Sequence, residues 1–186
     1  MTKDGQIYTL GRRMTNDLPL RFDPVLFAKQ GRQIEGDLAI RDMPRIVDLT
    51  PNPDTKLHVT MSFSTSSLQF PLVKGTIDGQ VVQSCQRCLG DTTVEIDQSF
   101  ELLLVSPDSV ELATQEGHEL FEYSGQFIST IELLEDETIL AMPIVAKHEL
   151  LNECEPIARK WFKQKEHEPA DAKRDNPFAA LKNLKT

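Results

Sequence analysis

The residues whose side chains are best suited to metal binding or redox chemistry are three cysteines and a histidine between residues 85 and 154. Cys85 and Cys88 form a CxxC pair, and His148 and Cys154 follow much later in the sequence. Thiolate and imidazole are preferred zinc ligands, and a structural zinc ion takes four of them in a tetrahedron. The His148–Cys154 spacing, H-x5-C, lies just outside the usual range for a second ligand pair.

Three interpretations of these cysteines stay open. All four residues could hold zinc as part of a structural adaptor. The CxxC pair could instead be a redox dithiol, but such pairs occur where a strand leads into a helix, and here Leu89-Gly90-Asp91 leads into another strand. The third interpretation is reduced cysteines packed under a hairpin turn that forms without metal. We expect this last arrangement, with no cofactor and with zinc as the alternative.

The sequence contains no recognisable enzymatic constellation. It has no glycine-rich phosphate loop, no GxSxG and no HExxH motif. Acidic pairs such as Glu132 and Asp136 lie within a run of charges, which is typical of a solvated helix face. We therefore predict no catalytic residues and a protein that is not an enzyme.

The elements that must position these residues are mostly strands. Leu57, Val59, Met61 and Phe63 alternate with polar residues, which predicts a strand with one buried and one wet face. Asp78-Gly79 is a strong hairpin signal between two further strands, over residues 68–75 and 80–85. A long strand over residues 94–104 follows, so the short connections predict an antiparallel meander of about five to six strands.

A few short helices complete an α+β fold. Asp23-Pro24 predicts a helix that ends at Gly31. Ser129 and Glu132 have capping-box spacing and predict a helix that ends at Pro143. We expect one domain over residues 1–162, followed by a flexible basic tail over residues 163–186.

The tail carries a short motif of its own. Residues 163–175 contain no apolar side chain except alanine, which predicts disorder. The motif then begins at a potential cap and presents an apolar helical stripe, and we predict that it binds a partner. A helix this short needs a surface on which to dock, either a groove of this chain or a partner, and we favour the partner. The predicted partner-binding residues are Asn176, Pro177, Phe178, Leu181 and Leu184.

Charge divides the chain unevenly. The net charge is −9, and counting residues by segment gives −12 for residues 101–155 and +4 for residues 156–186. Because RNA-binding faces need clustered Lys and Arg, we expect no direct RNA contact by the core. An acidic face either serves solubility or receives a basic protein. No apolar run is long enough for a membrane span or an export signal, so we expect a cytoplasmic protein without membrane contact.

Three segments together resemble the YceD-like family, the large ribosomal RNA subunit accumulation proteins. These are CQRCL at 85–89, LEDETILAMP at 134–143 followed by His148 and Cys154, and NPFAALKNLK at 176–185. The resemblance implies a bacterial ribosome-biogenesis factor needed for synthesis, processing or accumulation of 23S ribosomal RNA, with no established catalysis. Together with the acidic segment, it favours a basic protein or a pre-ribosomal particle of the large subunit as partner. Many relatives carry a further cysteine pair where this chain has Cys154 alone.

Overall fold

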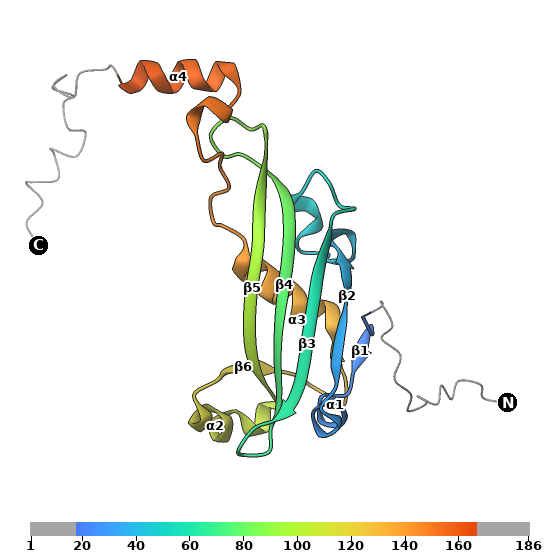
Figure 1. The fold of residues 1–186 in the computed structure, drawn as a ribbon. Helices are drawn as coiled ribbons and strands as arrows, with labels where there is room; N and C mark the ends of the chain where they lie inside the picture. The colour runs from blue at the N-terminus through green and yellow to red at the C-terminus, as the bar shows by residue number, and fades with distance from the viewer. Residues whose placement is uncertain (1–17, 167–186) are drawn as a thin grey trace, which may run out of the picture.

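A computed structural model describes residues 18–166, which form a twisted sheet with helices packed on one face and at its ends (Figure 1). The main sheet has the strand order β2-β3-β4-β5-β6, and a separate pair joins β1 to β7. The strands are β1 (Arg21–Phe22), β2 (Gln33–Ala39), β3 (Lys56–Thr65), β4 (Pro71–Ser84), β5 (Asp91–Val105), β6 (Glu119–Glu122) and β7 (Ile128–Ser129).

The two helices that the sequence predicts after Asp23 and Ser129 begin and end where their capping residues indicate. α1 (Pro24–Gln30) has the Asp23 side chain accepting from the Leu26 N–H, and it ends at Gly31 in a left-handed conformation. α3 (Thr130–Ala141) is capped by Ser129, whose hydroxyl accepts from the Glu132 N–H. The remaining α-helices of the described chain are α2 (Val110–Ala113) and α4 (Pro156–Glu166).

The predicted α+β class is confirmed, and β2 to β5 form the antiparallel meander. β6 differs, because it pairs with β5 in parallel. The chain first passes through α2 and the flanking 3-10 turns Pro107–Ser109 and Thr114–Glu116, a crossover long enough for β6 to run in the same direction as β5.

The predicted hairpin at Asp78-Gly79 is wrong. β4 runs straight through these residues, with Asp78 opposite His58 on one side and Asp97 on the other. The reversal between β3 and β4 lies at residues 66–70 instead, where Gln69 has a φ of 69°. Gly79 is used for close packing, because a Cβ built there would meet Leu57 Cδ2 at 2.7 Å.

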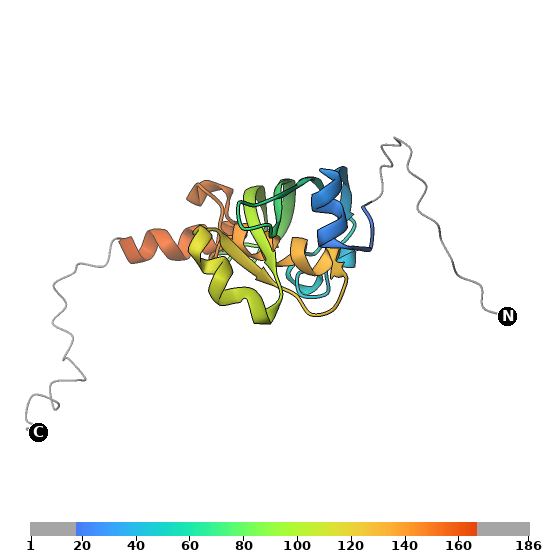
Figure 2. The same cartoon turned by 90° about the horizontal axis from the view of Figure 1, so that it is seen from below.

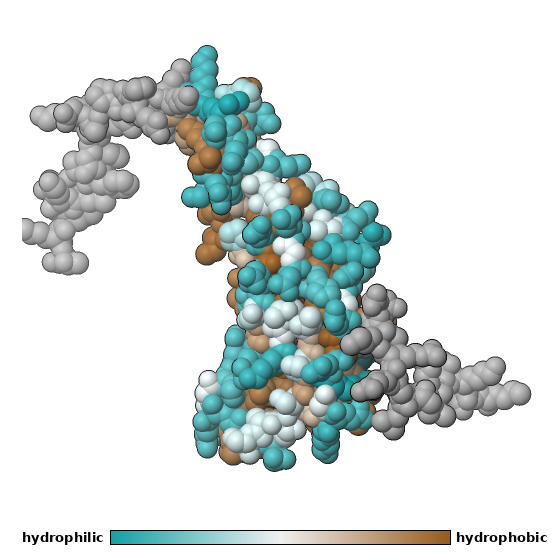
Figure 3. Space-filling model, in the orientation of Figure 1, coloured by the Kyte–Doolittle hydropathy of each residue, from teal (hydrophilic) through white to brown (hydrophobic). Residues whose placement is uncertain are grey.

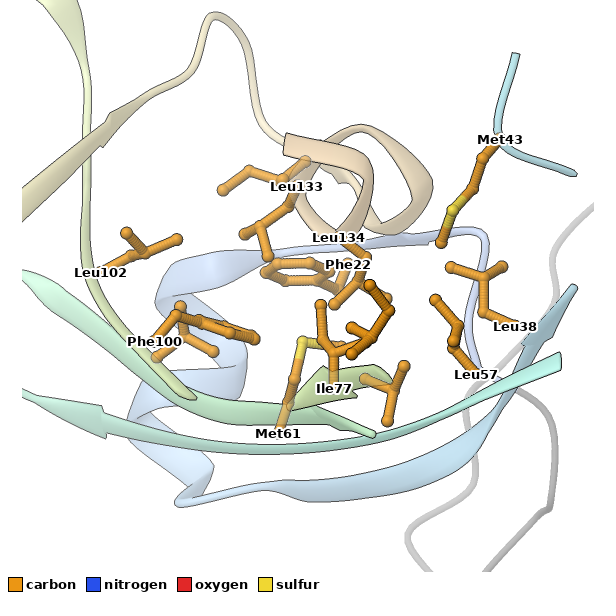
Figure 4. Close-up of a cluster of buried hydrophobic side chains, with 14 of the residues drawn as sticks. Phe22, Leu38, Met43, Leu57, Met61, Ile77, Phe100, Leu102, Leu133 and Leu134 are labelled. Atoms are coloured by element: carbon orange, nitrogen blue, oxygen red, sulfur yellow. The ribbon is translucent and has the colours of Figure 1, made fainter. Parts of the chain in front are cut away.

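The apolar core lies between the sheet and α3 (Figure 4). Leu133 and Leu134 point from α3 toward the core face of the sheet, where alternate residues of β3 and β4 meet them. Phe22 of β1 closes the core, with ring centroids 5.5 Å from Phe27 and 5.0 Å from Phe63. The predicted alternation of β3 is therefore confirmed, with Leu57, Val59, Met61 and Phe63 buried.

α4 extends away from the sheet in both views of the fold (Figures 1 and 2). It runs to Glu166, so it continues past the expected domain boundary after residue 162. The rest of the expected tail, with the predicted partner-binding motif, lies outside the described residues. Among helices between residues 18 and 166, none combines the length and apolar character that a membrane crossing requires.

Candidate functional site

The CxxC pair lies at the tip of the long β4–β5 hairpin, as the sequence predicts. The turn is closed by hydrogen bonds from the Cys85 N–H to the Gly90 carbonyl and from the Leu89 N–H to the Cys85 carbonyl, each 2.7 Å long. Leu89 adopts a left-handed φ of 62° in this turn. Because the turn is tight, both cysteines face the segment of chain that returns after α3.

The second half of the site comes from the segment between α3 and α4. This segment is joined to the hairpin tip by a 2.9 Å hydrogen bond from the Gln86 N–H to the Ala146 carbonyl. His148 follows two residues later, and Cys154 ends the 3-10 turn Leu151–Glu153. Two segments far apart in sequence are therefore held side by side by backbone contacts before any ligand is considered.

The structure brings Cys85, Cys88, His148 and Cys154 together, and we call these four residues the Cys/His cluster. Each offers one ligand atom, and the four atoms lie within 4.8 Å of one another. The Cys88 and Cys154 sulfurs are 3.5 and 3.7 Å from His148 Nδ1. Tetrahedral zinc with bonds of about 2.3 Å to sulfur and about 2.0 Å to nitrogen separates such atoms by about 3.6 Å. The two sulfur–nitrogen distances to His148 fit that geometry.

The second nitrogen of His148 fixes which ring atom faces the sulfurs. His148 Nε2 is 2.9 Å from the Asp91 carbonyl, which can only accept, so Nε2 carries the proton. Nδ1 then presents its lone pair to the cysteines. This arrangement of a donating outer nitrogen and a free inner nitrogen is typical of a metal-ligating histidine.

The pKa values of Cys85 and Cys154 shift in opposite directions from the ordinary thiol value. Burial acts to raise the pKa of Cys85, but N–H groups of the His148, Arg87 and Cys88 backbone donate to its sulfur and lower the pKa to about 5. Burial, reinforced by a hydrogen bond with the Cys88 thiol, raises the pKa of Cys154. A stabilised thiolate at Cys85 is an anionic ligand ready to receive a cation.

The redox alternative meets one requirement and lacks another. A low thiol pKa at Cys85 favours a reactive thiolate. However, Cys85 is completely buried, and β5 follows the pair where a thioredoxin-type site would have a helix. Thiol–disulfide exchange requires the attacking sulfur to be accessible, so the geometry does not favour a redox role.

Two supporting residues were absent from the sequence-based hypothesis. The Arg87 guanidinium donates to the His148 carbonyl, and the Asp91 carbonyl orients the His148 ring. Arg87 lies inside the CQRCL motif, which is the only sequence signal that could have suggested it. Asp91 acts through its backbone, so its side chain gave no signal at all.

Comparison with known proteins identifies the family. The family model described as "Large ribosomal RNA subunit accumulation protein YceD" matches residues 73–185. A Haemophilus influenzae protein named "Large ribosomal RNA subunit accumulation protein YceD" is 31% identical over 170 residues, which cover 90% of this chain and 96% of that protein. The chain belongs to the YceD family. The predicted resemblance is thereby confirmed.

The YceD match begins within β4 and includes the whole Cys/His cluster and the segment 176–185. No solved structure matches the chain. The YceD family is named for accumulation of the large ribosomal RNA subunit, and that name describes a role in ribosome formation without naming a reaction.

Proposed function

We propose that this protein is a non-enzymatic ribosome-biogenesis factor that supports synthesis, processing or accumulation of 23S ribosomal RNA. The observation that carries the proposal is the YceD match, which extends from β4 to residue 185. The test is a strain that lacks the gene. We expect 23S RNA to fall relative to 16S RNA and to recover when the gene is restored, and an unchanged ratio under several growth conditions would refute the proposal.

We further propose that the factor acts by binding a basic protein or a pre-ribosomal particle of the large subunit. The face of the sheet opposite the helices carries exposed carboxylates, with Asp78 and Asp97 directly opposite each other on β4 and β5. Like charges in this arrangement repel, and a cationic partner would relieve the repulsion. The strongly acidic segment 101–155 adds to the same electrostatic preference.

The predicted motif at Asn176–Leu184 is proposed as a second contact for that partner. The double variant Phe178→Ala with Leu181→Ala should leave the unfolding temperature nearly unchanged and abolish rescue of 23S RNA levels. Asn183→Ala, next to the apolar stripe, is the matched control and should rescue normally. A melting temperature several degrees lower in the double variant would place the stripe in the folded core and contradict the proposal.

A structural zinc site is a second proposal, supported by the convergence of the Cys/His cluster. Three sulfurs and one imidazole nitrogen supply the usual four-ligand set, with all four positions taken by protein and none open for catalysis. Zinc would tie the hairpin tip to the segment before α4. The geometry gives this alternative stronger support than the expectation of a metal-free turn.

Metal analysis of protein purified without chelator tests the zinc proposal. We expect about one zinc per chain, with loss of the metal in Cys88→Ser. Ser84→Ala changes a neighbouring hydroxyl outside the Cys/His cluster and should keep the metal. Zinc near zero in the unmodified protein would refute this proposal and leave the ribosome-biogenesis role standing.

A further inference from the structure

A groove with an apolar lining lies beside the base of α4, next to the Cys/His cluster. It has a volume of about 350 Å³ and is lined by Leu150, Leu151, Asn152 and Arg159. Figure 3 shows apolar residues gathered along this flank of the molecule. Leu150 of the lining is 57% exposed, and Ile144, earlier in the same segment, is 97% exposed. Such a concentration usually marks a binding surface.

Arg159 gives the groove a polar requirement as well. Its Nε atom is buried and has no hydrogen-bond partner among residues 18–166. Because Arg159 also lines the groove and a guanidinium carries five N–H donors, the groove suits an occupant that brings a carbonyl oxygen together with apolar side chains. The last turn of a helix has both, because its final carbonyls lack partners within the helix.

The chain itself contains a segment with these properties. Residues 176–185 combine the apolar stripe of Phe178, Leu181 and Leu184 with two lysines, Lys182 and Lys185. Exposed glutamates flank the groove-lining residues in sequence, at positions 149, 153 and 155. The lysines of the segment can therefore pair with these carboxylates, while its apolar stripe can meet the leucines of the lining.

The length of chain between α4 and the motif permits the contact. α4 ends at Glu166, and Arg159 lies about 10 Å back along the helix at 1.5 Å per residue. Residues 167–178 can span about 40 Å when extended. A tether of this length also gives an effective concentration on the order of millimolar, so a weak contact is sufficient.

We infer that residues 176–185 dock reversibly in the groove lined by Leu150, Leu151, Asn152 and Arg159 when no partner is bound. The partner of the proposed function would then compete with this internal contact for the same apolar stripe. Only this competition rests on the proposed function, since the docking itself depends on the groove and the segment alone. The groove thereby restrains the motif until a tighter ligand is present.

Nitrogen-15 NMR of the full chain tests the docking. Phe178→Ala with Leu181→Ala should shift the amide signals of residues 150–152 and 159, whereas the control Asn183→Ala should leave them in place. Leu150→Lys should release the segment. In that background, the two tail substitutions should cause little additional shift of the groove signals. The matched control Leu112→Lys, on α2, should not release it. Unchanged groove signals in the tail variant would overturn the inference.

A peptide of residues 176–186 added to the full-length tail variant gives an independent readout. It should move the groove signals back toward the unmodified positions, with half-saturation on the order of millimolar or tighter. No movement at several millimolar would overturn the inference. Signals of the unmodified chain that change with protein concentration would also overturn it, because they would assign the docked segment to a second copy. Loss of 23S RNA rescue is measured separately, so either result can fail alone.

Discussion

The two ends of this protein are held together by different physical means. At the end near β1 and α1, three phenylalanine rings and the α3 leucines form a continuous apolar core. At the α4 end, the Cys/His cluster is surrounded by backbone hydrogen bonds, while large apolar side chains such as Leu89, Ile144 and Ile157 are exposed. One end is stabilised by burial, and the other depends on a few polar contacts and on whatever ligand they receive.

The largest effect should come from the apolar end. Phe22→Ala removes a ring that is 1% exposed and contacts two other rings. We expect the free energy of unfolding in urea to fall by about 3–5 kcal/mol. Ile144→Ala, at an almost fully exposed position, should change it by less than about 0.5 kcal/mol. Equal losses in the two variants would mean that the ends are not distinct.

The proposed zinc site predicts that metal removal loosens only the other end. A chelator should speed amide hydrogen exchange in residues 85–91 and 144–155 by about tenfold or more, which corresponds to about 1.4 kcal/mol or more of local stability. Exchange in β3 should stay slow, because the apolar core does not include the Cys/His cluster. Faster exchange throughout the sheet would show instead that the metal holds the whole domain.

A polar contact at the core boundary should have an intermediate effect. The Glu135 carboxylate is buried and accepts from the Arg45 N–H and Nε. Because Arg45 is half exposed and its backbone contact survives mutation, Arg45→Met should destabilise by about 1 kcal/mol. Arg41→Met removes a largely exposed ion pair with Asp54 and should be nearly neutral in the same thermal melts. A neutral Arg45→Met would remove this contact from the account of the core boundary.

The smallest effect should appear on the wet face of the sheet. A hydrogen bond to Asp37, with the charges of Glu35 and Asp78, raises the pKa of His58. The raised pKa means that protonated His58 stabilises the fold below about pH 6.5, and this contribution is lost as pH rises through the folded-state pKa.

Because His58 is 45% exposed, the difference between the unmodified chain and His58→Gln should be under about 1 kcal/mol at pH 5.5 and vanish at pH 8.5. Urea melts at the two pH values measure it. Thr60→Ala, on the same strand face, is the uncharged control, because loss of its hydrogen bond to Thr76 should change stability equally at both pH values. A stability difference that is larger at pH 8.5 than at pH 5.5 would contradict the expected pH dependence.

Local pattern was sufficient for much of the fold. The alternation along β3 and the capping residues of α1 and α3 act within a few residues, so their predictions are confirmed. The hairpin prediction at Asp78-Gly79 failed because tertiary packing overrode turn propensity. Leu57 approaches the position of a Gly79 side chain too closely for any larger residue, and no local signal reveals that approach.

The Cys/His cluster shows the same limit. The sequence contains all four residues in plausible order, but their convergence depends on the path of the chain after α3. That path is set by the backbone hydrogen bond between Gln86 and Ala146 and by the hydrogen bond between His148 Nε2 and the Asp91 carbonyl. Backbone atoms carry no sequence signature, so the side chains could be nominated and their meeting could not be predicted.

The long pairing of β4 with β5 makes the Cys/His cluster a check on correct folding. The two strands are matched from Leu72↔Leu103 to Ser84↔Asp91, and Cys85 and Cys88 follow at the far end. A slip of one residue would turn every side chain of one strand to the opposite face and shift the tip by about 3.3 Å. The four ligand atoms can meet only when the strand register is correct and α3 has packed on the sheet. A chain in which the Cys/His cluster is assembled has therefore already excluded its misaligned forms.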